Sequence, residues 1–287
     1  MRHHENLISA ETLNSHLDRT DWRVIDCRFN LLQPQAGQRS YLQEHIPGAV
    51  YAHLDDDLAA PVGPDTGRHP LPDPEDLART FGQFGIGSDT QVVVYDEASG
   101  AIAARAWWLL RWLGHMPVAV LDGGLARWRT LGLPLQAGPV RVAARQFEAR
   151  PRPGLVVETA ELAADRAAGA ALRVVDARDA DRFRGEREPI DAVAGHVPSA
   201  LNLPCAENLG PDGTWKSGPE LHRMWSDVLR DEPDEPFSVM CGSGVSACQL
   251  VLSSLLAGLG EPRLYVGSWS EWIRDPRRPI ATGPADG

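Results

Sequence analysis

The sequence predicts an α/β protein with two similar domains, each a mainly parallel β-sheet covered by helices on both faces. Three observations favour this class. Short apolar runs alternate with helical patterns along the whole chain. Sequence blocks recur in the same order at an offset of about 150 residues, and 287 residues are enough for two domains with a core each.

The repeat consists of four matched blocks. In the first half they are residues 24–28, 45–50, 91–96 and 120–128, and in the second half residues 174–178, 196–201, 237–241 and 265–272. A period this long indicates a duplicated domain rather than a solenoid. We therefore expect an N-terminal domain over residues 1–137, a linker over 138–154 and a C-terminal domain over 155–287, because Gly-Pro and Pro-Gly pairs flank the polar stretch between them.

Individual elements follow from the periodicity. In the first half, residues 102–113 are predicted to be helical and 118–121 to be the strand that follows. In the second half, residues 237–240 read as a buried strand, 247–259 as an amphipathic helix and 263–266 as the next strand. Ligands of such sheets bind beyond the carboxyl ends of the strands.

Cys241 stands at such a strand end, in the segment Cys-Gly-Ser-Gly-Val-Ser-Ala-Cys. Amides of a tight loop and a helix N-terminus that face one sulfur favour a thiolate and hold an anion beside it. Gly242 and Gly244 suit a backbone that curls around the sulfur. Cys241 is therefore the candidate nucleophile, whereas Cys27, Cys205 and Cys248 lack this context and are predicted to pack as small apolar side chains.

The two halves differ at this position. The first half has Asp96 and Glu97 where the second has the cysteine and Gly242. Two acids in place of a thiol predict that the first domain lacks the chemistry of the second.

Composition excludes several other classes of function. The net charge of −11 and the absence of a basic tract argue against a nucleic-acid partner. No run of apolar residues is long enough for a membrane span, and four scattered cysteines do not form a disulfide framework. These features predict a cytoplasmic protein.

Taken together, the motifs resemble the rhodanese family, specifically its tandem-domain sulfurtransferases. The resemblance rests on the Asp-x-Arg strand ends, the His-[Ile/Val]-Pro-x-Ala turns, the Cys241 loop and the C-terminal Gly-Ser-Trp-x-Glu-Trp. It implies transfer of a sulfane sulfur from a small anionic donor through a Cys241 persulfide, without a metal or organic cofactor. The implied acceptor is cyanide, a thiol or reduced thioredoxin. Loop positions Gly242, Ser243, Gly244, Val245, Ser246 and Ala247 are implied to stabilise the thiolate and the persulfide.

The loop resembles that of 3-mercaptopyruvate sulfurtransferases. Thiosulfate-specific relatives tend to carry cations just after the cysteine, where this chain has Gly242 and Ser243. Arg182 matches the first of two substrate-binding arginines of the mercaptopyruvate enzymes. Ile190 stands where the second is expected, with Arg184 and Arg187 as the alternatives considered, so thiosulfate stays open as the donor.

A Ser-His-Asp relay is a further feature of the family. Ser243 and His45 match its serine and histidine, which makes Ser243 a catalytic candidate and His45 a substrate-site candidate. No acid lies between Asn30 and Gln43, where the aspartate is expected.

Three other classes of protein compete with the sulfurtransferase. A Cys-x5-Arg phosphatase loop is excluded because Ala247 stands six residues after Cys241. A non-catalytic rhodanese binding module needs no cysteine at the strand end. A redox sensor with Cys248 as the resolving thiol requires that residue to turn back from its helix toward Cys241.

Overall fold

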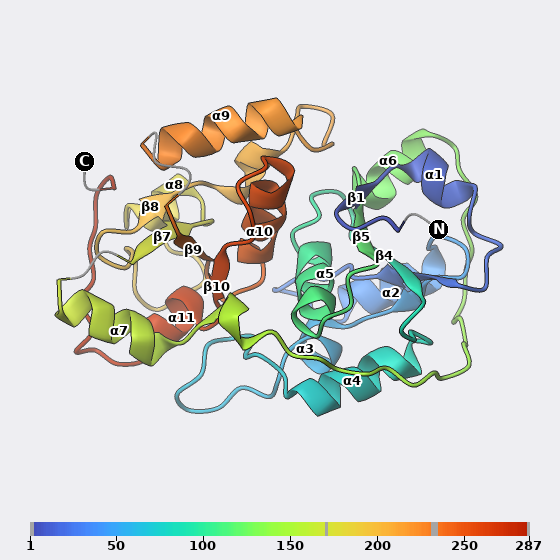
Figure 1. The fold of residues 1–287 in the computed structure, drawn as a ribbon, viewed down its shortest axis with the longest axis horizontal. Coiled ribbons are helices and arrows are strands. Elements are labelled where there is room, and N and C mark those ends of the chain that lie inside the picture. The colour runs from blue at the N-terminus through green and yellow to red at the C-terminus, as the bar shows by residue number, and fades with distance from the viewer. Residues whose placement is uncertain (1–2, 170–171, 231–234, 286–287) are drawn as a thin grey trace. The chain divides into compact units, whose positions relative to one another are not determined.

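The computed structural model describes residues 3–169, 172–230 and 235–285. The chain forms two compact units (Figure 1). Unit 1 comprises Met1–Ala60, Pro72–Arg152 and Leu209–Trp215, and unit 2 comprises Pro61–Leu71, Pro153–Asn208 and Lys216–Gly287. Segment 61–71 is flanked in sequence by unit 1 but belongs to unit 2, and segment 209–215 is flanked by unit 2 but belongs to unit 1. The sequence repeat does not predict this exchange. Among the described residues, no helix is long and apolar enough to cross a bilayer.

Unit 1 is built on a five-stranded parallel sheet in the order β1-β5-β4-β2-β3. Its strands are β1 (Leu7–Ile8), β2 (Trp22–Asp26), β3 (Val50–Tyr51), β4 (Gln91–Tyr95) and β5 (Val118–Leu121). Its helices are α1 (Ala10–Asn14), α2 (Ala36–Gln43), α3 (Leu54–Asp57), α4 (Pro74–Gln83), α5 (Ala103–Trp112) and α6 (Gly124–Thr130).

Unit 2 repeats this topology with the order β6-β10-β9-β7-β8, again parallel throughout. Its strands are β6 (Val156–Val157), β7 (Arg173–Asp176), β8 (Leu201–Asn202), β9 (Phe237–Met240) and β10 (Arg263–Tyr265). Its helices are α7 (Thr159–Ala167), α8 (Ala180–Phe183), α9 (Gly218–Val228), α10 (Ala247–Leu256) and α11 (Ser268–Trp272), with short 3-10 turns η1 (Pro153–Leu155) and η2 (Cys205–Asn208).

Strand alternation shows how helices cover both faces of the unit 2 sheet. Met240 and Tyr265 point into one apolar cluster with Trp269 of α11 and Leu162 of α7. The neighbouring strand positions, such as Val239, face the opposite side, where α10 packs on β9 and β10 (Figure 1). Unit 1 is layered in the same way, with α1 and α6 on one face and α5 on the other. The predicted α/β class with parallel sheets is confirmed.

The predicted element boundaries need one notable correction. The helix after the cysteine loop ends at Leu256, three residues before the expected 259. Gly258 and Gly260 adopt positive φ angles of 79° and 89°, which an α-helix does not accommodate. The hydroxyl of Ser254 donates to the carbonyl of Gly260 and holds this turn against the helix.

Candidate active site

The Cys241 backbone is fixed at the carboxyl end of β9. Its N–H donates to Ser268 Oγ at 3.1 Å, and its carbonyl accepts from Trp269 N at 3.0 Å. Ser268 adopts a left-handed φ of 51°, and its hydroxyl donates in turn to the Tyr265 carbonyl. The Gly-Ser-Trp segment therefore holds the cysteine in place, and the Cys241 side chain is buried at 1% exposure.

Close contacts surround both loop glycines, and the backbone contact and positive φ of Gly244 require a glycine there. Gly244 has a φ of 75°, and a Cβ on it would lie 2.3 Å from the Val266 carbonyl oxygen. A Cβ on Gly242 would lie 2.9 Å from Arg68 Nη2 and 3.7 Å from Arg182 Nη2. Two guanidinium groups thus approach the residue directly after Cys241, although the sequence places no cation in the loop itself.

The equivalent loop of unit 1 shows what this backbone turn can bind. Leu125 N and Ala126 N donate to the carbonyls of Asp96 and Glu97, as Trp269 N and Ser270 N do to those of Cys241 and Gly242, so Asp96 is the counterpart of Cys241. The carboxylate of Asp96 accepts four backbone N–H groups of its own loop, those of Ala98, Gly100, Ile102 and Ala103, at 2.8–3.2 Å. The turn that leads into α5 therefore binds the carboxyl group of its own Asp96, and these N–H groups act against burial, which raises the pKa of Asp96.

Ser243 meets a histidine that the sequence did not single out. Its Oγ lies 2.7 Å from Nδ1 of His69, and both side chains are buried. His45 lies fully buried in unit 1, its Nδ1 is 2.7 Å from the Tyr41 carbonyl oxygen, and its ring stacks on Tyr41. The role of His45 as a substrate-site residue stays a prediction, and these contacts show how it packs within unit 1.

Segment 61–71 brings His69 to this place. Gly67 N donates to Glu271 Oε2 at 3.3 Å and Arg68 N to Ser270 Oγ at 3.1 Å, so the segment is bound along α11. The sequence did carry one signal. Gly-Arg-His-Pro lies in a long stretch without apolar periodicity, and long loops of compact domains are often functional.

Arg182 is buried and engaged by two acids. Its guanidinium donates to Glu188 at 2.8 Å and to Asp191 at 3.1 Å. Asp191 also forms an ion pair with Arg68. Arg184 and Arg187 are the alternatives for the second substrate-binding arginine. Arg184 pairs with Glu186 and Arg187 pairs with Asp181, both at the exposed surface. Ile190 is itself 41% exposed.

The remaining predicted loop residues lie where the motif puts them. Val245 is buried, Ser246 is the N-cap residue of α10 without a side-chain cap bond, and Ala247 is the first helical residue. Cys248 is buried inside α10, with its Sγ 3.4 Å from the Gly244 carbonyl oxygen.

All four cysteines are free thiols. Burial raises the pKa of the Cys205 thiol to about 12 and raises that of Cys27 well above its usual value. These two are therefore protonated at neutral pH and poor nucleophiles.

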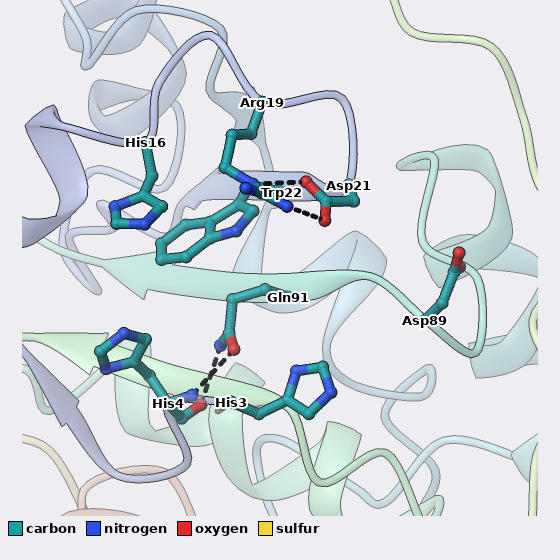
Figure 2. A pocket seen from close by; sticks show the side chains of 8 residues that line it. All are labelled: His3, His4, His16, Arg19, Asp21, Trp22, Asp89 and Gln91. Atoms are coloured by element: carbon teal, nitrogen blue, oxygen red, sulfur yellow. Dashed lines mark hydrogen bonds and ion pairs between the residues drawn. The ribbon is translucent and has the colours of Figure 1, made fainter. Parts of the chain in front are cut away.

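A separate pocket of about 250 Å³ lies in unit 1 (Figure 2). Arg19 and Asp21, which lie next to each other in its lining, pair at 2.5 Å, and Gln91 bonds to the backbone of His4. His16 stacks on Trp22 with ring centroids 4.3 Å apart. Within the part of the chain that the structure describes, no group of three or more His, Cys, Asp or Glu side chains is placed to hold a metal ion.

Comparison with known proteins agrees with these motifs. A family model described as a rhodanese-like domain matches residues 9–131 and again 158–275. A probable 3-mercaptopyruvate sulfurtransferase of Pseudomonas aeruginosa is 48% identical over 279 residues, covering 96% of this chain and 98% of that protein. A putative thiosulfate sulfurtransferase of Mycobacterium tuberculosis is 40% identical over 280 residues, covering 97% and 98%. The structure of a 3-mercaptopyruvate sulfurtransferase from Leishmania major superposes with a TM-score of 0.83 at 30% identity, covering 95% of this chain and 76% of that one.

Proposed function

This chain belongs to the rhodanese family, and we propose that it is a sulfurtransferase that moves sulfur from 3-mercaptopyruvate to a thiophilic acceptor through a persulfide on Cys241. One observation carries the assignment of Cys241. The loop that begins with this residue has a counterpart in unit 1 whose backbone N–H groups bind a carboxylate at the same position. An N–H cradle of this kind stabilises a thiolate before the reaction and a persulfide anion after it.

The first half-reaction follows from this placement. The Cys241 thiolate attacks the sulfur of mercaptopyruvate, an S–S bond forms, and the C–S bond breaks with its electron pair on the enolate of pyruvate. The proton of the transferred sulfhydryl ends on the enolate carbon, so pyruvate and a Cys241 persulfide anion are the products. In the second half-reaction the acceptor attacks the outer sulfur, and Cys241 leaves as the thiolate.

Two groups support mercaptopyruvate as the donor. With Nδ1–H of His69 donating to Ser243 Oγ, the serine hydroxyl hydrogen is directed to the carbonyl oxygen of the donor, where negative charge develops. Arg68 and Arg182, which flank Gly242, supply guanidinium groups for the carboxylate. Arg68 thus stands in for the cation that Ile190 does not provide.

Thiosulfate is the second candidate donor. The same two guanidinium groups suit a sulfonate, and a relative with 40% identity carries the name of a thiosulfate sulfurtransferase. Thiosulfate has no carbonyl group for Ser243 to polarise, so the Ser243–His69 pair favours mercaptopyruvate.

For the acceptor we propose a small thiol, cyanide or reduced thioredoxin. The four free thiols agree with a reducing compartment, and we propose the cytoplasm as the location.

The decisive experiment compares kcat/KM for 3-mercaptopyruvate and for thiosulfate on one preparation, with cyanide as acceptor. We expect a preference for mercaptopyruvate of about tenfold or more, which corresponds to about 1.4 kcal/mol of transition-state binding. Mass spectrometry of the donor-treated protein checks the intermediate, because Cys241 should gain one sulfur atom and Cys241→Ser should not. If Cys241→Ser keeps its activity with both donors, the proposal fails.

A further inference from the structure

Six charged side chains of unit 2 form a chain of alternating sign beside the Cys241 loop. In order they are Asp176, Arg178, Glu188, Arg182, Asp191 and Arg68. Arg178 lies 2.7 Å from Asp176 and 3.6 Å from Glu188, and Arg182 joins Glu188 to Asp191. Three guanidinium groups and three carboxylates give this chain no net charge, although it contains both cations of the proposed donor site.

Asp191 is the carboxylate that neutralises this site. Its Oδ1 pairs with Arg68 and its Oδ2 with Arg182, and only 3% of the side chain is exposed. These are the two guanidinium groups that approach Gly242. Asp191 therefore bridges the same pair of cations that a donor carboxylate would use, and any anion that enters the site does so in the presence of this fixed negative charge.

The charge of the donor determines how strongly Asp191 opposes its binding. A fixed carboxylate repels an anion with an energy proportional to the charge of that anion, so a dianion loses about twice as much as a monoanion. Burial raises the pKa of Asp191, and Arg68 and Arg182 act against this effect by stabilising the carboxylate.

We propose that Asp191 is a specificity-determining residue, a built-in counterion of Arg68 and Arg182 that biases the donor site toward monoanions such as mercaptopyruvate and against dianions such as thiosulfate. This inference rests on the proposed function, because the anions in question are the sulfur donors of that reaction. The charge preference itself is a binding property and can be measured without turnover.

The test measures binding of two unreactive anions to full-length Cys241→Ser protein by titration calorimetry. Pyruvate serves as the monoanion and sulfate as the dianion. When Asp191→Asn is added, the dissociation constant should fall about tenfold for pyruvate and about a hundredfold for sulfate, because one unit of negative charge is removed from the site. In the Cys241 protein, Asp191→Asn should lower KM for thiosulfate more than KM for mercaptopyruvate. Loss of sulfur transfer with an intact shift in anion binding would count against the proposed function alone.

Glu186→Gln is the matched control. It removes one negative charge from the same loop, but Glu186 pairs with Arg184 at the exposed surface, so both affinities should stay at their starting values. Asp191→Glu keeps the charge and should keep the preference for the monoanion. If the asparagine variant does not fold, Asp191→Ser tests the same point and leaves room for water at the guanidinium groups.

Weaker or unchanged binding of both anions to the Asp191→Asn protein would overturn the proposal, because Asp191 would then serve to position the arginines. An equal gain for pyruvate and sulfate would overturn it as well, since a charge effect has to scale with the charge of the ligand.

Discussion

At the scale of single residues, the site combines positions that the sequence reveals with positions that only packing reveals. Cys241, Gly242 and Ser243 are contiguous, and their type and spacing already predict a nucleophile in an anion-binding loop. His69 and Arg68 are more than 170 residues away in sequence, as the Ser243–His69 separation of 174 shows. No local pattern relates them to Cys241, because their position is fixed by hydrogen bonds to Ser270 and Glu271.

Ser243→Ala tests the role of the Ser243–His69 pair. Loss of the hydroxyl should lower kcat/KM for mercaptopyruvate by about a hundredfold, the usual effect of removing one oxyanion donor. The value for thiosulfate should change by less than about threefold, since that donor has no carbonyl group to polarise. Both donors are assayed on the same preparation, so thiosulfate reports any general damage to the loop. An equal loss of kcat/KM with both donors would mean that Ser243 acts on Cys241 and not on the carbonyl group of mercaptopyruvate.

At the scale of elements, the apolar strands and the helix of the first half are the parts of the fold that the sequence predicts best. Strands β5 and β9 match their predicted ranges, and α5 begins and ends within one residue of its range, because apolar periodicity reports these elements directly. Segments 61–71 and 209–215 were not predictable, since their assignment to a unit depends on tertiary contacts rather than on local pattern. The same limit applies to His69, which contacts Ser243 but lies in no recognisable motif, whereas the sequence singles out His45 by its His-Ile-Pro motif.

The unit 1 loop offers a test of the N–H cradle itself. Asp96→Ala removes the acceptor of four backbone N–H groups, of which those of Gly100 and Ala103 are buried, and should lower the free energy of unfolding by about 3 kcal/mol. Glu97→Ala, at the neighbouring position, removes an acid that is 58% exposed and should change the free energy of unfolding by less than about 1 kcal/mol. Chemical denaturation of the two variants gives both values. Similar effects of the two substitutions would show that the cradle contributes little to the stability of unit 1.

At the scale of the whole molecule, the duplication preserved a scaffold and changed what its anion-binding loops hold. Both units keep an Asp-x-Arg clamp at the end of the second strand in their repeat, with Arg28 on Asp26 and Arg178 on Asp176, each at 2.7 Å. Arg178 also lies over the ring of Trp269, 4.7 Å from its centroid. The clamps fix the backbone beside each loop, so a carboxylate in one unit and a thiol in the other occupy comparable surroundings.

The pH dependence of stability is a property of the whole chain in which one buried residue of unit 1 can be isolated. Burial lowers the pKa of His115 to about 4, from 6.5 for an unburied histidine, while its Nε2 bonds to the Thr90 carbonyl at 2.9 Å. Between these values the unfolded chain binds more protons than the folded one. Stability contributed by neutral His115 is therefore complete above about pH 6.5 and is lost as the pH falls toward 4.

The full loss from this residue amounts to about 3 kcal/mol, at about 1.4 kcal/mol for each pKa unit. Burial raises the pKa of Asp57 and Asp122, and these carboxyls act in the opposite direction, so wild type has to be compared with a variant. His115→Gln keeps a donor for Thr90 and cannot be protonated. Its free energy of unfolding, measured by urea denaturation from pH 7 to pH 4, should fall less steeply than that of wild type. His222→Gln replaces an exposed histidine, so the pH dependence of its free energy of unfolding should match that of wild type. If the pH dependence of His115→Gln also matches that of wild type, His115 takes up its proton without unfolding the core around it.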